Sequence, residues 1–253
     1  MSTTGENRKP FTSWQRAVVH RPGFLWNGCV AMLAGLAARV HDSCIAGVGT
    51  LHAAMLGLFT VADVQGGGEI ARGELMRYFA EVAWYPTALL PSQGAHWEAV
   101  DDHLANATLA DSTSSLTLLF RFDDAGLITA IHADARASEV GKDMIMLTWD
   151  CSVSNYQLRH GMLVPTRGGA AKGGKPYFVG DLTLLVNEFS PRQGKHAAEF
   201  AALFQVIATH LHVNTCYSLL YEHGEPRCPT SPFQLTMNSS KKPACAPSNK
   251  AHP

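Results

Sequence analysis

Two acids and an arginine recur at helical spacing, and these residue types are suited to binding or catalysis. Glu74, Arg77 and Glu81 are spaced i, i+3 and i+7, so they share one face of a helix. One interpretation is an exposed row of ion pairs. The other places Arg77 and Glu81 at the mouth of a cavity, where they orient a polar head group.

Acid–base catalysis through Glu81 needs a second carboxylate, and Asp101 is the candidate. Asp101 and Asp102 do not pair with each other, because adjacent residues on a strand point to opposite faces. A hydrolase or isomerase that uses Glu81 and Asp101 is therefore an alternative function, which requires both carboxylates to face one pocket. The chain has no Gly-x-Ser-x-Gly nucleophile motif. We therefore assign no catalytic residue and favour a protein that is not an enzyme.

Metal binding is disfavoured by the spacing of the histidines. His210 and His212, with Cys216, offer zinc-ligand types. On a helix, however, residues two apart diverge by about 200°. No fourth ligand follows at a diagnostic spacing, so we predict neither a metal nor a cofactor.

Large aromatic side chains provide the stronger signal. They form either an ordinary core or the lining of a pocket for an apolar ligand. With the charged pair, the candidate ligand-binding residues are Trp26, Phe59, Arg77, Glu81, Trp84, Tyr85, Trp97 and Phe120.

These side chains must be positioned by strands on both sides of one helix. Alternating residues predict strands over about 24–34, 37–47 and 49–62. A period near 3.6 then predicts a helix over about 71–83 that is stopped by Pro86.

The period returns to two after the helix. We expect a strand from Trp97, a further strand over 105–109, a hairpin over 116–132 and a loop over 133–143. The remaining expected elements are a strand over 144–149, a strand–turn–strand unit over 155–166 that turns at His160-Gly161, and a last strand over 176–189.

Composition and charge indicate which partners and which cellular location to expect. Apolar residues are 46% of the 253, and the formal net charge of −1 is spread along the chain, which favours a sizeable core and no nucleic-acid partner. No apolar run reaches about 18 residues, so we expect no transmembrane segment. The polar start lacks the apolar region of a signal peptide, which makes a cytoplasmic location the default.

The chain divides into four expected regions. These are a flexible N-terminus (1–22), a curved-sheet domain (23–190), a helical extension (191–225) and a disordered tail (226–253) rich in proline, serine and lysine.

The motifs Gly73-Glu-Leu-Met-Arg-Tyr78 and Pro86-Thr-Ala-Leu-Leu-Pro91 carry a family resemblance, supported by Trp97-Glu-Ala-Val-Asp101 and Phe120-Arg-Phe122. Over about residues 24–189 the chain resembles an uncharacterised bacterial family of unknown function with a lipoprotein-carrier-like curved antiparallel sheet. It departs at Gly168-Gly-Ala-Ala171, where Glu-Val-Ala-Trp is expected, and again after about residue 190.

The expected fold class is therefore α+β: a strongly curved antiparallel sheet, or half-barrel, with an amphipathic helix against its concave face. This resemblance implies non-catalytic binding of a hydrophobic or lipid-like small molecule in the half-barrel cavity. A second alternative to it is a structural or interaction protein with a filled core. The sequence leaves the oligomeric state and the identity of the ligand open.

Overall fold

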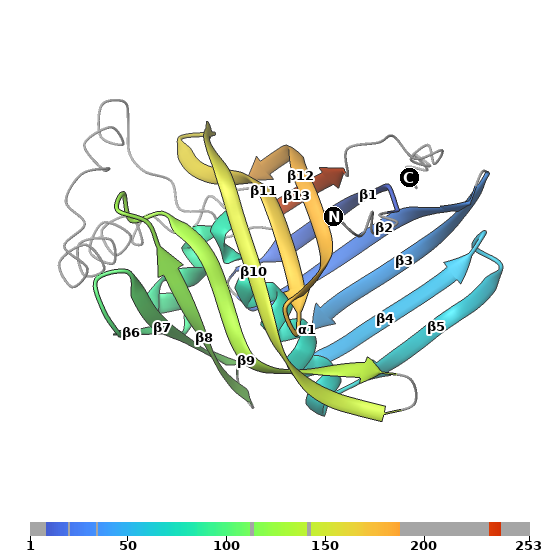
Figure 1. Ribbon diagram of the computed structural model, residues 1–253, viewed down its shortest axis with the longest axis horizontal. Coiled ribbons are helices and arrows are strands. Elements are labelled where there is room, and N and C mark those ends of the chain that lie inside the picture. The colour runs from blue at the N-terminus through green and yellow to red at the C-terminus, as the bar shows by residue number, and fades with distance from the viewer. Residues whose placement is uncertain are drawn as a thin grey trace, which may run out of the picture.

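A computed structural model describes residues 9–19, 21–33, 35–111, 114–140, 143–187 and 233–238. Within these residues the fold is α+β, with one antiparallel sheet of 13 strands and one α-helix (Figure 1). The strands are β1 (Phe11–Val18), β2 (Gly23–Leu33), β3 (Leu36–Ile45), β4 (Val48–Met55), β5 (Phe59–Gly66), β6 (Ala95–Ala99), β7 (Leu104–Asp111), β8 (Ser114–Phe122), β9 (Ile128–Val140), β10 (Asp143–Arg159), β11 (Met162–Lys172), β12 (Lys175–Asn187) and β13 (Phe233–Asn238).

The sheet joins two runs of consecutive antiparallel hairpins through its last strand. The spatial order is β5-β4-β3-β2-β1-β13-β12-β11-β10-β9-β8-β7-β6. We call β5–β1 the first half and β12–β6 the second half of the sheet. β13 pairs with β1 on one side and with β12 on the other, and it therefore links the two halves.

The helix α1 (Gly68–Ala80) begins after Gly67 and ends earlier than the period predicts. The Glu81 amide donates back to the carbonyl oxygens of Arg77 and Tyr78, which tightens the last turn. Three 3₁₀ turns follow, η1 (Val82–Trp84), η2 (Pro86–Leu89) and η3 (Pro91–Gln93). Pro86, the expected stop, is therefore not what ends α1: the helix ends at Ala80, and Pro86 is the first residue of η2.

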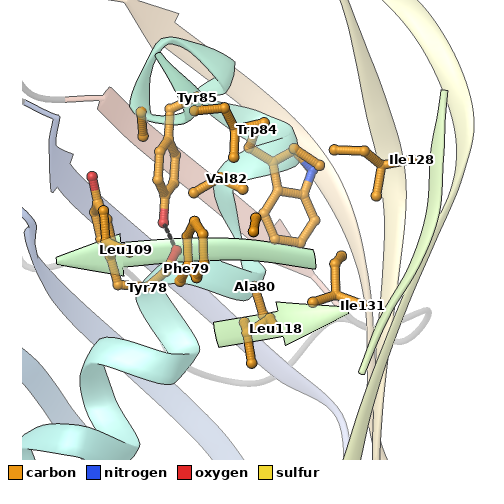
Figure 2. Packing of buried hydrophobic residues seen from close by; sticks show 14 of the residues in the cluster. Tyr78, Phe79, Ala80, Val82, Trp84, Tyr85, Leu109, Leu118, Ile128 and Ile131 are labelled. Atoms are coloured by element: carbon orange, nitrogen blue, oxygen red, sulfur yellow. Dashed lines mark hydrogen bonds between the residues drawn. The ribbon is translucent and has the colours of Figure 1, made fainter. Parts of the chain in front are cut away.

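Strands from both halves of the sheet contact α1. The helix packs against β2–β5 of the first half and against β8 and β9 of the second. Figure 2 shows the resulting core, in which Phe79 and Trp84 lie near Leu118 and Ile131, side chains of the second half. This packing fixes the direction in which the charged face of α1 points.

Four expectations about the elements need correction. Residues 11–18 belong to the sheet as β1, so the expected flexible start does not include them. The single strand expected over 49–62 is two strands, β4 and β5, separated by a turn with positive φ at Leu56 (54°) and Gly57 (69°). The loop expected over 133–143 is largely the end of β9.

The fourth correction concerns the tail. Residues 233–238, expected to be disordered, form β13. The helical extension expected over 191–225 lies outside the described residues. The turn at His160-Gly161 is confirmed between β10 and β11.

Candidate ligand-binding site

A cavity of about 1070 Å³ lies between α1 and the strands of both halves of the sheet. Side chains from α1 and η1, from β1–β4 and from β9–β12 line it. Its wall combines aromatic rings with several charged groups. The lining residues used below are Trp26, Asp42, Glu74, Arg77, Glu81, Trp84, Arg136, Trp149, Lys172, Tyr177 and Phe178.

Arg77 joins the helix by hydrogen bonds to two strands of the first half. Its Nη1 donates to Asp42 Oδ2 on β3, its Nε donates to Glu81 Oε1 at 3.0 Å, and its Nη2 donates to Gln15 Oε1 at 3.2 Å on β1. The Gln15 amide nitrogen in turn donates to Glu81 Oε2 at 2.5 Å. Arg77 therefore has its charge balanced by two carboxylates.

The rings of Phe24 and Trp26 complete the surroundings of Arg77. The guanidinium lies 4.8 Å from the Phe24 ring centre and 5.0 Å from that of Trp26, a cation–π arrangement. Burial opposes the charge of Arg77, but Glu81 and Asp42 more than offset this, so its pKa lies above the ordinary value. With the Arg77 and Glu81 side chains each 18% exposed, the interpretation as an exposed stripe is wrong.

Glu74 lies about one turn before Arg77, and the pKa of its carboxyl is raised. Burial, and next the charge of Asp42, raise the pKa of Glu74 to about 8. Asp42 Oδ1 and Glu74 Oε2 are both buried and receive no hydrogen bond within the described residues. The raised pKa of Glu74 fits this pair of atoms, because a protonated carboxyl can donate to a neighbouring carboxylate.

A second group of charged side chains lies on the second half of the sheet, and its Arg136 approaches Glu74 of α1 to 3.9 Å. The Arg136 guanidinium of β9 is 4.2 Å from the Trp149 ring centre, and Lys172 Nζ of β11 is 5.3 Å from that of Tyr177. Trp149 Nε1 donates to the Tyr177 hydroxyl at 2.9 Å and connects the two aromatic rings. Burial and the nearby Arg136 lower the pKa of Lys172.

Trp84 belongs both to the core and to the cavity wall. Its Nε1 donates to the Pro165 carbonyl oxygen at 2.7 Å, and the residue is 4% exposed. The ring lies against Gly168 of β11, where an added Cβ would be 2.9 Å from Trp84 Cη2. The indole is thus held by both the turn after α1 and a strand of the second half.

The eight candidate residues divide into two groups of four. Trp26, Arg77, Glu81 and Trp84 line the cavity, and their role in binding stays a prediction.

The other four candidate residues are not part of the cavity lining. Tyr85 and Phe120 are fully buried in the core, and the Tyr85 hydroxyl donates to the Tyr78 carbonyl oxygen at 2.6 Å (Figure 2). Trp97 packs on Phe120 with ring centres 5.1 Å apart, and Phe59 is 67% exposed at the start of β5.

The catalytic alternative lacks its second carboxylate in the cavity. Asp101 is exposed beyond the end of β6, where its Oδ1 accepts a hydrogen bond from the His103 amide at 2.8 Å, and only Glu81 of the pair lines the cavity. Across the part of the chain that is described, no group of three His, Cys, Asp or Glu side chains could hold a metal ion. His210, His212 and Cys216 lie outside it.

The residues that sequence reasoning missed are the cavity residues on β9–β12 and the partners of Arg77. Arg136 was expected in a loop, and Trp149, Lys172 and Tyr177 lie on strands far along the chain. Alternation along each strand does indicate shared faces, but it does not show which face of the sheet meets α1. Asp42 gave no distinct signal, because the same strand also carries Arg39, His41 and Ser43.

Comparison with known proteins places the chain in a family without giving it a function. No helix among residues that the structure describes is long and apolar enough to cross a membrane. No curated protein and no solved structure matches the chain. Residues 1–184 match the model described as "Family of unknown function (DUF6920)", and the chain belongs to that family.

Proposed function

We propose that the protein binds a hydrophobic or lipid-like small molecule in this cavity and does not transform it. The observation that carries the proposal is the cavity itself, whose volume of about 1070 Å³ is at the upper end of small-molecule sites. Ligand sites are commonly lined by aromatic side chains with a few placed polar groups. Trp26, Trp84, Trp149 and Phe178 provide such a wall.

The arrangement of the sheet around the helix supports a half-barrel as the container. Strands of the first and second halves contact the same helix, and side chains from both line the same cavity. In this proposal the sheet bends around α1, and the cavity is the part of the concave side that α1 leaves unfilled. A filled core, as in a structural or interaction protein, is disfavoured by the size of that space.

The test is ligand extraction followed by a cavity-filling variant. The purified protein is extracted with organic solvent, the extract is identified by mass spectrometry, and the stripped protein is titrated with a fluorescent fatty acid. Ala170 lines the cavity on β11. Ala170→Trp should weaken binding at least about tenfold, which corresponds to about 1.4 kcal/mol.

The matched control is Ala99→Trp, which adds the same side chain at an exposed position of β6 outside the cavity lining. It should bind the probe as the native protein does. A folded protein that yields no extracted molecule and binds no apolar probe would contradict the proposal and favour the structural or interaction protein.

A further inference from the structure

We propose that the ligand carries an anionic head group, a carboxylate or a phosphate, and that Arg136 and Lys172 hold it. This inference rests on the proposed function and adds the chemical class of the ligand. It moves the head-group site from Arg77 and Glu81 near the end of α1 to the part of the cavity wall formed by β9–β12.

Each of the two cations lies over an aromatic ring, and this contact does not use its N–H groups as hydrogen-bond donors. Arg136 stacks on Trp149, and Lys172 lies over Tyr177. The hydrogen bond of 2.9 Å from Trp149 Nε1 to the Tyr177 hydroxyl holds the two rings together. A stacked guanidinium keeps the N–H groups at its edge free for a planar or tetrahedral anion.

The other two arginines of the cavity lining have carboxylate partners within hydrogen-bond distance. Arg77 is bonded to Asp42 and Glu81, and Arg167 donates to Asp181 Oδ1 at 2.9 Å. Among the described residues, no carboxylate lies within hydrogen-bond distance of Arg136 or Lys172. Lys9, a further cation of the lining, is exposed and contacts Met32 Sδ at 3.4 Å.

Glu74 forms a long ion pair with Arg136 that includes no hydrogen bond. Its Oε1 lies 3.9 Å from Arg136 Nη2, beyond hydrogen-bond distance. Burial and the charge of Asp42 raise the pKa of Glu74 to about 8, so it is mostly protonated at neutral pH. Arg136 and Lys172 both line the cavity, and the Arg136 side chain is only 11% exposed. An anion bound there would interact in surroundings that screen charge poorly.

The experiment compares three probes with the same chain: hexadecanoic acid, hexadecyl phosphate and hexadecanol. Binding of each to the stripped protein is measured by calorimetry. We expect at least one anion to bind about tenfold or more tightly than the alcohol. The preferred anion then distinguishes a fatty-acid head group from a phosphate head group.

Substitutions test whether Arg136 and Lys172 cause the preference for an anion over the alcohol. Arg136→Gln and Lys172→Gln should each reduce the affinity for the anion about tenfold and leave that for the alcohol nearly unchanged. Arg136→Lys should retain part of the preference. The matched control is Arg159→Gln on β10, an exposed arginine outside the cavity lining, which should keep the full preference. If Arg136→Gln fails to fold, Lys172→Gln still tests the site.

The failures of the two proposals are distinguishable. Equal affinity for the alcohol and both anions would overturn the cationic site and leave the proposed function standing. An anion preference that survives both glutamine variants would also overturn the site. No binding of any probe would overturn the proposed function itself.

Discussion

At the scale of residues, one proton decides the charge balance around α1. Asp42, Glu74 and Glu81 surround Arg77, and three ionised carboxylates would leave this buried group with excess negative charge. Burial and Asp42 raise the pKa of Glu74 from 4.5 to about 8. Glu74 therefore acts at neutral pH as a hydrogen-bond donor rather than as an anion.

This protonation predicts how Glu74→Gln changes the pH dependence of stability. The folded protein keeps a proton that the unfolded chain releases above pH 4.5, so the native protein loses stability as pH rises from about 4.5 to about 8. Glutamine is neutral throughout and can still donate to Asp42. The variant should therefore gain stability over the native protein across this window, by an amount on the order of a few kcal/mol.

Urea unfolding at a series of pH values measures this difference. Glu98→Gln is the matched control, because Glu98 is exposed on β6. Its stability curve should run parallel to that of the native protein. A parallel curve for Glu74→Gln as well would mean that Glu74 is ionised in the folded protein at neutral pH.

At the scale of elements, the small residues of β11 make room for the indole that follows α1. Gly168 and Gly169 pair with the region of β12 around Gly180. An added Cβ on Gly168 would approach Trp84 Cη2 and Cζ2 to 2.9 and 3.0 Å. The departure from the expected Glu-Val-Ala-Trp at this position is thus matched to the side chain packed against it.

Gly168→Ala should destabilise the protein by about 1–3 kcal/mol, because the extra methyl group overpacks a position where the neighbour is a rigid ring. The control Gly67→Ala adds a methyl group into open space. Combining Gly168→Ala with Trp84→Phe should cost less than the sum of the two single changes, since the smaller ring relieves the clash. Additive costs in urea unfolding would show that the contact is absent.

Periodicity was sufficient to predict the helix and most strands, but it failed where local composition was misleading. Residues 133–143 are polar, yet residues 133–140 continue β9, because pairing with β10 satisfies their backbone groups. Residues 11–18 were missed for a related reason. Their side chains alternate between buried and exposed, but this alternation indicates a strand only once the pairing with β2 is known.

The candidate site could be predicted only in part, for a geometric reason. Arg77 and Glu81 were recognisable because helical spacing places them together without any knowledge of the sheet. Arg136, Trp149 and Lys172 meet through pairing between three strands. Such contacts depend on register, and register is set by tertiary structure as well as by local sequence.

At the scale of the whole molecule, the sheet depends on a strand distant in sequence from its neighbours. β13 separates β1 from β12, and through it the two halves form a continuous sheet. Without β13, the edges of β1 and β12 would present unpaired backbone groups. The helix contacts both halves, so the helix and the core around it would then hold them beside each other.

Deleting residues 233–253 should therefore weaken the two strands next to β13 more than the rest of the sheet. We expect amide protection in β1 and β12 to fall by at least about tenfold, or about 1.4 kcal/mol in opening free energy, with smaller changes in β7 and β8. Hydrogen exchange followed by mass spectrometry measures each strand. A truncation that removes only residues 241–253 retains β13 and is the matched control. If both truncations leave β1 and β12 equally protected, the halves are held together by the helix and the core rather than by β13.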